Sequence, residues 1–267
     1  MHWDGSVTLI TGASQGIGRT VARTAVDRGA RVGLVARNQA DLESVLAEIG
    51  GRGVVASADV SRREEAEAAV RKVAAELGPI DIVVANAGVG LYGPFTESDP
   101  EDYARLMGVN VLGTMYVVRA ALASMVERRR GHVVIVGSVA GRMGTPFEAV
   151  YSASKFAQVG LAEALAVELS AFGIGVSLVN PGPVDTSFFE RRGSAYARSF
   201  PRKVSADRVA AAVMAAVEGG RFEQLVPRWF RGALVFRHVV PPLYLSGTRS
   251  SFKKELADLG GGSRPRP

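Results

Sequence analysis

Thr11-Gly12-Ala13-Ser14-Gln15-Gly16-Ile17-Gly18 is the stretch that decides the fold. The apolar run 6–10 precedes it and a helical pattern follows it, so its glycines stand at a strand-to-helix turn. Glycines at such a turn let the backbone turn tightly and approach a pyrophosphate at the N-terminus of the helix. The spacing is G-x-x-x-G-x-G and not the standard G-x-G-x-x-G, so the motif gains its weight from the pattern around it.

Short apolar runs alternate with helical patterns from this turn onward. Gly29 and Gly50-Gly51 end two of the helices, and Asp99-Pro100 begins another. Ser61 with Glu64 matches a capping box ahead of a further helix. Repeated strand–helix units predict an α/β fold, a doubly wound (Rossmann) parallel sheet of about seven strands with helices on both faces. The predicted strands, continuous and rich in valine and isoleucine, are 6–10, 31–36, 53–58, 80–85, 132–137, 174–179 and 223–226.

The composition fits one ordinary globular domain of 267 residues, 47% hydrophobic and 22% charged. No break in composition divides the chain before about residue 260, so we expect a single catalytic domain over 5–258 and a disordered tail over 259–267. Cysteine is absent, and three scattered histidines argue against a metal site. A strand-like run begins by Ser6 and leaves no room for a signal peptide, so we expect a cytoplasmic protein.

The net charge of +6 raises the question of an anionic partner. The arginines are spread along the chain, and the one tight basic run, Arg128-Arg129-Arg130, stands at an expected helix end, where cations complement the helix dipole. This distribution argues against nucleic-acid binding. Attraction of a small anionic ligand is the preferred use of the excess charge.

Tyr151-Ser152-Ala153-Ser154-Lys155 puts a phenol and an ammonium four residues apart at the start of an expected helix, 151–172. At that spacing the two side chains share one helix face, about 5–6 Å apart at Cβ. The cation is expected to lower the tyrosine pKa from about 10 toward neutrality. Such a tyrosine is a general acid or base, although a surface Tyr/Lys pair is the simpler interpretation of the spacing alone.

The second strand ends Val35-Ala36-Arg37-Asn38, without the acidic residue that usually holds the ribose 2′-hydroxyl of NAD. Arg37 would instead meet a 2′-phosphate through a charge-assisted contact. The sequence therefore predicts NADP(H) over NAD(H), against the alternative that Arg37 is a solvated loop residue.

The motifs in their order make the chain resemble the short-chain dehydrogenase/reductase family in its single-domain form, over about residues 5–227. The resemblance rests on the glycine-rich turn, on Asp59-Val60, and on the Asn86-Ala87-Gly88 element. It rests further on Asn180-Pro181-Gly182 followed by Thr186, and on four positions that match the family's catalytic set, Asn110, Ser138, Tyr151 and Lys155.

By this resemblance Tyr151 is the general acid in carbonyl reduction and the base in alcohol oxidation. Lys155 would lower its pKa and bind the nicotinamide ribose, and Ser138 would hydrogen-bond the substrate oxygen. Asn110, inside a helix, would hold a water that links Lys155 to solvent. The implied cofactor-binding residues are Gly12, Ser14, Gln15, Gly16, Ile17, Gly18, Arg37, Asp59, Val60, Asn86, Ala87, Gly88, Tyr151, Lys155, Pro181, Gly182, Val184 and Thr186.

Three segments are expected to set substrate specificity: residues 89–95, residues 139–147, and a lid over 187–202. Their side chains are mostly apolar and aromatic, which favours a hydrophobic ketone or secondary alcohol. Four arginines in or beside the lid leave open an acidic group such as an acyl-carrier phosphate: Arg191, Arg192, Arg198 and Arg202.

The C-terminal extension, 228–258, is too short and too charged to span a membrane, and no transmembrane segment is expected. It suits packing against the body or a second subunit, which is preferred, or an interfacial helix or a cover over the substrate cavity. The helix 151–172 is apolar over more than one stripe, which predicts a homodimer or homotetramer.

The residues thus favour an NADP(H)-dependent oxidoreductase that interconverts a carbonyl and a secondary alcohol on a hydrophobic small molecule. Two alternatives stay open. One is another nicotinamide enzyme of the same fold, an epimerase or an enoyl reductase. The other is a cofactor-binding regulatory protein without turnover, against which the intact Tyr151 and Lys155 argue.

Overall fold

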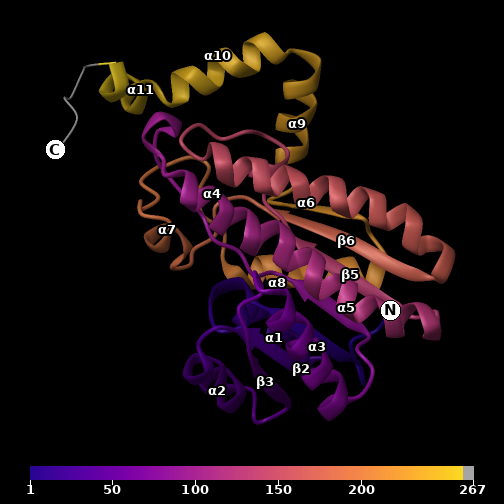
Figure 1. Ribbon diagram of the computed structural model, residues 1–267. Coiled ribbons are helices and arrows are strands. Elements are labelled where there is room, and N and C mark those ends of the chain that lie inside the picture. The colour runs from indigo at the N-terminus through magenta and orange to yellow at the C-terminus, as the bar shows by residue number, and fades with distance from the viewer. Residues whose placement is uncertain (261–267) are drawn as a thin grey trace.

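The computed structural model describes residues 1–260 and contains one seven-stranded sheet in the order β3-β2-β1-β4-β5-β6-β7, with every neighbouring pair parallel (Figure 1). The chain order reverses between β1 and β4, where an open α/β sheet places its ligands. The predicted sheet is therefore confirmed. The strands are β1 (Val7–Thr11), β2 (Arg31–Ala36), β3 (Gly53–Ser57), β4 (Ile82–Ala85), β5 (Gly131–Val136), β6 (Ile174–Pro181) and β7 (Glu223–Val226).

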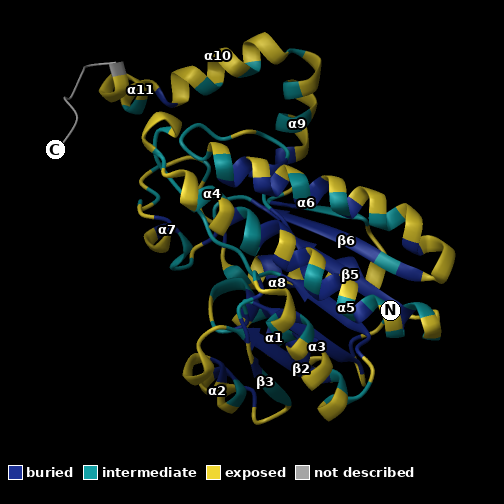
Figure 2. Cartoon of the chain, in the orientation of Figure 1, coloured by how far each residue is buried: buried dark blue, intermediate teal, exposed yellow. Residues whose placement is uncertain are grey.

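Helices cover both faces of the sheet. On one face, side chains of α1, α2 and α8 form a single apolar core with the strands, and on the other, α3, α5 and α6 do so. The five inner strands of the sheet are buried almost throughout, as Figure 2 shows in dark blue, whereas the outer strands β3 and β7 are only partly buried. The helices of the body are α1 (Gly16–Asp27), α2 (Gln39–Glu48), α3 (Arg63–Leu77), α4 (Pro100–Met107), α5 (Gly113–Arg128), α6 (Ala149–Glu168), α7 (Phe188–Arg191) and α8 (Ala206–Gly219).

Two-sided burial explains the composition of the strands. All six residues of β5 are buried, and so are all five of β1, so neither strand alternates polar with apolar side chains. At Gly33 in β2 the sheet and α3 approach so closely that a Cβ would lie 2.4 Å from the Val73 side chain. A glycine is therefore required at this position for α3 to pack on the sheet.

The helix starts were predicted with mixed success. α4 begins at Pro100 as predicted, and Asp99 caps it by accepting a hydrogen bond from the Glu101 N–H at 2.9 Å. The capping box of Ser61 and Glu64 is wrong. α3 begins at Arg63 without a side-chain cap, and the Ser61 hydroxyl donates to the Asp59 carboxylate at 2.7 Å. The N-cap position is Arg62, so Ser61 lies one residue too early to cap the helix.

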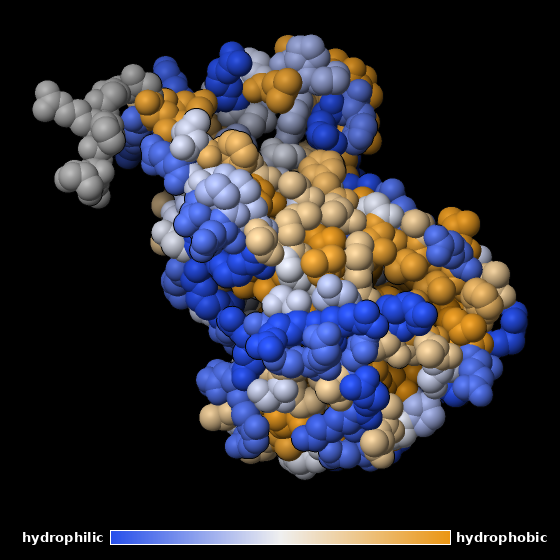
Figure 3. All heavy atoms as spheres, viewed as in Figure 1, coloured by the Kyte–Doolittle hydropathy of each residue, from blue (hydrophilic) through white to orange (hydrophobic). Residues whose placement is uncertain are grey.

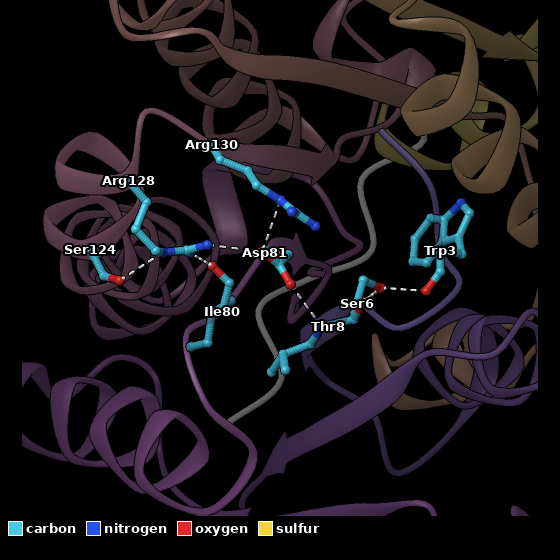
Figure 4. Close-up of polar contacts among 9 residues, drawn as sticks. Trp3, Ser6, Thr8, Ile80, Asp81, Ser124, Arg128 and Arg130 are labelled. Atoms are coloured by element: carbon cyan, nitrogen blue, oxygen red, sulfur yellow. Dashed lines mark hydrogen bonds and ion pairs between the residues drawn. The ribbon is translucent and has the colours of Figure 1, made fainter.

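A charged cluster lies at the amino edge of the sheet, the side where the N-terminal ends of the parallel strands lie, just before β4 (Figure 4). The Asp81 carboxylate accepts from Arg128 at 3.0 Å and from the Val7 N–H at 3.2 Å, and Arg130 lies 3.4 Å from it. Arg128 also donates to the Ile80 carbonyl at 2.6 Å. The basic run does stand at a helix end, as predicted, but two of its three arginines neutralise a nearly buried carboxylate.

A π-helical turn, Gly108–Leu112, joins α4 to α5, so that Pro100–Arg128 is one continuous helical run. By length and composition alone this run could cross a membrane, with a mean hydropathy of 1.5 in its most apolar window. Half of that window is buried inside the molecule, and core helices pass the same test, so the run is weak evidence for a membrane span.

The C-terminal extension forms three helices, α9 (Phe230–Val239), α10 (Pro241–Ser251) and α11 (Lys253–Gly260). In Figure 1 they lead away from the body and return toward the lid. Residues 259 and 260 end α11 and are helical, and the rest of the tail predicted to be disordered, 261–267, lies outside the described residues.

Candidate active site

Ser138 and Tyr151 meet at the carboxyl edge of the sheet, that is, the side where the C-terminal ends of the parallel strands lie. Ser138 directly follows Gly137 at the end of β5 and caps a short 3-10 turn, Val139–Gly141, by accepting from the Ala140 N–H at 3.1 Å. Tyr151 lies in the first turn of α6, and the Ser138 hydroxyl lies close enough to its phenol to act to lower the phenol's pKa. The end of β5 and the start of α6 thus place two hydroxyl groups together at the edge where ligands bind.

The expected low pKa of Tyr151 is wrong for this structure. The side chain is 8% exposed, and its burial raises the pKa to about 12, although the Ser138 hydrogen bond acts in the opposite direction. Lys155 Nζ lies 5.8 Å from the centre of the Tyr151 ring. The prediction from spacing included the effect of this cation on the Tyr151 pKa but not the opposing effect of removing water from the phenol. The phenol is therefore protonated at neutral pH.

Lys155 is itself a buried cation. Its side chain is 3% exposed, and Nζ donates to the Val136 carbonyl at 3.1 Å and to Gln158 Oε1 at 2.8 Å. Both acceptors are neutral, and burial lowers the pKa of Lys155 to about 7. The ammonium form is thus poised to lose or regain a proton near neutrality.

Asn110 stands in the π-helical turn, where the helical hydrogen-bond pattern is interrupted. Its side chain clamps the loop after β4 by accepting from the Val89 N–H at 2.8 Å and donating to the Val89 carbonyl at 3.0 Å. Its backbone carbonyl accepts from Gln158 Nε2 at 2.7 Å and from Thr114 Oγ1 at 2.8 Å. Gln158 therefore connects Lys155 to the turn that carries Asn110.

The glycine-rich turn leads into α1 as predicted. Gly12 and Gly16 have φ of 65° and 53°, and a Cβ at Gly18 would lie 2.2 Å from the Gly12 carbonyl. Asn86 ties the turn to β4 by donating to the Thr11 carbonyl at 2.9 Å, and Thr186 lies over it, with its methyl 3.2 Å from a Cβ built at Gly16. The remaining turn residues, Ser14, Gln15 and Ile17, lead directly into the first turn of the helix.

The other predicted cofactor residues line the same edge. A Cβ at Gly88 would lie 3.3 Å from Asn110 Oδ1 and 3.7 Å from Lys155 Nζ, and Ala87 donates its N–H to Thr11 Oγ1 at 3.0 Å. Val60 packs on α5, and Val184 forms an isolated bridge with Val204. Pro181 ends β6, and Gly182 follows it, covered by the Phe230 ring.

Arg37 is exposed at the end of β2, with no ion pair to any residue within 1–260. Burial acts to raise the Asp59 pKa, but hydrogen bonds from Ser61 and the charge of Arg37 outweigh it and hold the pKa below its usual value. Burial lowers the pKa of Arg191, and the positive charge of Arg37 lowers it further. Arg37, just after β2, and Arg191, in the lid, thus place two positive charges in the same region.

These residues fit a dinucleotide. α1 has no side-chain cap, so its first N–H groups are open to a pyrophosphate. Asn180 Oδ1 is buried at the end of β6 without a hydrogen-bond donor among the described residues. When bound, a nicotinamide cofactor would supply hydride chemistry, with Lys155 and the glycine-rich turn as its holders.

The lid is closed over the tyrosine. The Phe188 ring lies 5.6 Å from the Tyr151 ring, and both belong to a small apolar cluster with Val89 and Leu91. Arg192 is 7% exposed and pairs with Glu148, while Arg198 pairs with Glu255. Two of the four arginines suggested for an acidic substrate group are therefore neutralised within the chain.

Sequence reasoning missed Gln158 and the Arg192–Glu148 pair. Gln158 is fully buried one helical turn after Lys155, and a polar residue at that spacing inside an apolar run was the available signal. Glu148 and Arg192 are 44 residues apart, and no pattern in the sequence joins them.

Comparison with known proteins identifies the family. The family model described as short chain dehydrogenase matches residues 6–197. The chain belongs to the short-chain dehydrogenase family. A Bos taurus 3-ketodihydrosphingosine reductase is 37% identical over 195 residues, which cover 70% of this chain and 59% of that protein. The match to this relative thus spans about three fifths of its length.

Solved structures of short-chain dehydrogenases share the fold. A Burkholderia phymatum member in complex with NAD has a TM-score of 0.84 and 28% identity, with 91% of this chain and 96% of that chain covered. An alcohol dehydrogenase from Thermococcus sibiricus, complexed with 5-hydroxy-NADP, has a TM-score of 0.74 and 28% identity, with coverages of 82% and 95%. Proteins of this family and fold therefore bind either nicotinamide cofactor, and both the predicted family and the predicted fold are confirmed.

Proposed function

We propose that this short-chain dehydrogenase is an NADP(H)-dependent oxidoreductase that interconverts a carbonyl and a secondary alcohol on a hydrophobic substrate. The observation that carries the proposal is the contact of the Ser138 and Tyr151 hydroxyls at the carboxyl edge of the sheet, with Lys155 one helical turn away. Two hydroxyls on one substrate oxygen suit a reaction in which that oxygen gains or loses a proton.

Each side chain has a distinct task in this reaction. The Tyr151 phenol holds its proton at neutral pH, since burial raises its pKa to about 12, and it gives that proton to the substrate oxygen in the reducing direction. The Ser138 hydroxyl donates to the same oxygen and stabilises the charge that develops there. Lys155, with a pKa of about 7, supports the tyrosinate that remains and takes part in its reprotonation.

Carbonyl reduction is favoured over the two alternatives. A phenol kept protonated by burial is an acid, which suits a carbonyl oxygen that must be protonated. The name of the bovine relative specifies a reductase of a ketone, which supports the same reaction class. The epimerase, enoyl reductase and regulatory hypotheses gain no support from any contact at the site.

A panel assay tests the proposed activity. NADPH oxidation is followed at 340 nm with steroid, fatty-acyl, quinone and small aromatic ketones, with Tyr151→Phe as the matched blank. We expect at least one hydrophobic ketone to give a rate that the blank lacks. Equal rates in the two proteins with every ketone would overturn the proposed mechanism, and dinucleotide binding without turnover would favour the regulatory alternative.

The preference for NADP(H) is supported by Arg37 and tested by its removal. Because a charge-assisted contact with a 2′-phosphate is worth about 1.5–3 kcal/mol, Arg37→Ala should weaken NADPH binding roughly ten- to a hundred-fold. NADH binding should stay within about twofold, because NADH has no 2′-phosphate. Fluorescence titration measures both affinities. Arg52→Ala, an exposed arginine just before β3 at the opposite edge, is the matched control, and equal losses for the two cofactors would refute the preference.

A homodimer or homotetramer is the proposed assembly. α3, α5 and α6 leave an open groove of about 740 Å³ between them, lined partly by Met115, Tyr116, Leu161 and Leu165. A second copy would cover this apolar surface around a two-fold axis. Sedimentation at micromolar concentration should show a dimer or a tetramer, and a monomer alone would count against it.

A further inference from the structure

The excess positive charge of the chain is concentrated in one segment, residues 228–254, here called the arm. The arm contains no Asp or Glu, and its six basic residues are Arg228, Arg231, Arg237, Arg249, Lys253 and Lys254. The whole chain has 32 Lys and Arg against 26 Asp and Glu, so the remaining 26 basic residues are balanced by the 26 acidic ones. The net charge of +6 is therefore the charge of the arm.

None of these six basic side chains forms an ion pair with any residue in the described range, 1–260. Arg237 lies over the Phe156 ring of α6 at 5.6 Å, and Arg231 and Arg249 are exposed. Elsewhere in the structure fifteen ion pairs connect basic residues to carboxylates. The arm thus differs from the rest of the surface in presenting cations without counter-charges.

The arm also exposes large apolar side chains. Val235, Phe236 and Val239 of α9 are 62%, 46% and 72% exposed, and their spacing puts them on one helix face. Leu243 and Leu245 of α10 are 60% and 62% exposed. Figure 2 draws α10 largely exposed, and Figure 3 shows hydrophobic and hydrophilic surface side by side on this part of the molecule.

Contacts with the body hold the arm at its two ends. At the base, Phe230 is 4% exposed and its ring packs on Gly182. At the far end, Phe252 stacks on Phe147 at 5.9 Å, and the Arg198 guanidinium lies 3.5 Å from its ring centre. The exposed apolar residues lie between these two anchors, where Figure 1 shows α9 and α10 projecting from the body.

We propose that the arm docks on the surface of an anionic lipid bilayer. An apolar helix face flanked by arginines is the pattern of a helix that lies in the membrane interface, with its apolar side chains among the acyl chains and its cations against lipid phosphates. Charge decides between a membrane and a second copy of this chain. Two arms face to face would bring together six cations from each copy with no carboxylate between them, whereas an anionic surface neutralises them.

Vesicle co-sedimentation of the full chain tests the proposal. We expect binding to phosphatidylglycerol vesicles at low salt, weak binding to phosphatidylcholine vesicles, and release as the salt concentration rises above ~0.5 M. The triple variant Val235→Ser/Phe236→Ser/Val239→Ser should lower the partition coefficient by at least about tenfold. The triple variant Arg231→Gln/Arg249→Gln/Lys253→Gln should lower it by more, since each cation contributes about fivefold.

The matched control is Val167→Ser, which removes a 75% exposed valine near the end of α6 and should leave binding unchanged. All the substituted side chains are exposed, and thermal unfolding monitored by circular dichroism verifies that each variant folds. Equal binding by the parent and both triple variants, or no binding to phosphatidylglycerol, would overturn the proposal. If the apolar triple variant instead abolishes self-association in sedimentation while the parent ignores vesicles, the arm is an interface between copies. The readout involves neither cofactor nor turnover, so its failure is distinct from failure of the proposed activity.

Discussion

The two edges of the sheet both bury a charged side chain, and they treat it in opposite ways. At the amino edge Asp81 faces Arg128, Arg130 and the Val7 N–H, so its charge is neutralised and its hydrogen bonds are satisfied. At the carboxyl edge Lys155 faces two neutral oxygens, one from Val136 and one from Gln158. The first arrangement stabilises the fold, whereas the second keeps a cation in a state that its surroundings do not favour.

This difference separates a charge whose partners fix its protonation state from a charge that can titrate. A buried charge with a complete set of partners holds one protonation state and one position. A buried charge with neutral partners titrates near neutrality, as the lowered pKa of Lys155 shows, and it remains available to a ligand. Mutations at the amino edge should therefore change the stability of the fold, and mutations at the carboxyl edge should change the catalytic rate.

The largest expected effect is on catalysis at the carboxyl edge. Tyr151→Phe removes the proton donor and should lower kcat by at least about 10²-fold. The free energy of unfolding should change by less than about 1 kcal/mol, because the lost hydroxyl leaves only the Ser138 bond unmade. Steady-state kinetics and urea denaturation measure the two quantities. A variant with the kcat of the parent would remove the carboxyl edge from the reaction.

The next effect is on stability at the amino edge. Asp81→Asn removes a nearly buried carboxylate charge from Arg128, whose side chain is 27% exposed, and from Arg130, whose side chain is 62% exposed, and should lower the free energy of unfolding by about 1.5–3 kcal/mol. The kcat should not change. Urea denaturation provides the measurement. Asp207→Asn is the control, since its ion pair with Arg23 is exposed and should contribute less than about 0.5 kcal/mol.

The smallest effect is a pH dependence of stability. Burial lowers the Lys155 pKa from 10.5 to about 7, so between those pH values the unfolded state binds more protons and stability rises with pH. The stabilising contribution is fully present above 10.5 and is lost as the pH falls through 7. Relative to Lys155→Met, the parent protein should therefore gain about 2 kcal/mol between pH 7 and 9.

Urea denaturation at several pH values measures this gain. Tyr151→Phe should run parallel to the parent over the same window, because the Tyr151 pKa of about 12 lies above it. Lys155→Met running parallel to the parent as well would show that the lysine is not buried as a cation, and the contrast between the two edges would disappear.

Local pattern was enough to predict the sheet and to single out the Tyr151/Lys155 pair, whereas Ser138 and Asn110 were chosen by the family resemblance. The apolar run 31–36 matches its strand at both ends, because a strand buried on both faces has a composition that few loops share. Ser138, Tyr151 and Lys155 do come together, since α6, which carries the tyrosine and the lysine, begins beside the carboxyl end of β5, after which Ser138 lies.

Contacts between residues far apart in the sequence account for the features that the sequence did not predict. The Tyr151 pKa was predicted from its neighbour on the helix, but Phe188, 37 residues away, helps to exclude water and reverses the shift. Ser61 was assigned to a helix cap, but α3 begins at Arg63, so the N-cap position falls on Arg62. The partner of Glu148 comes from the lid, beyond any local spacing.

The position of the Phe188 ring against Tyr151 has a consequence for the order of events in turnover. A substrate that reaches the phenol would displace the Phe188 ring, so its entry would exchange one set of apolar contacts for another. A large apolar substrate would replace the contacts that it displaces, whereas a small hydrated one would leave water at the phenol. The Phe188 ring would therefore favour large apolar substrates.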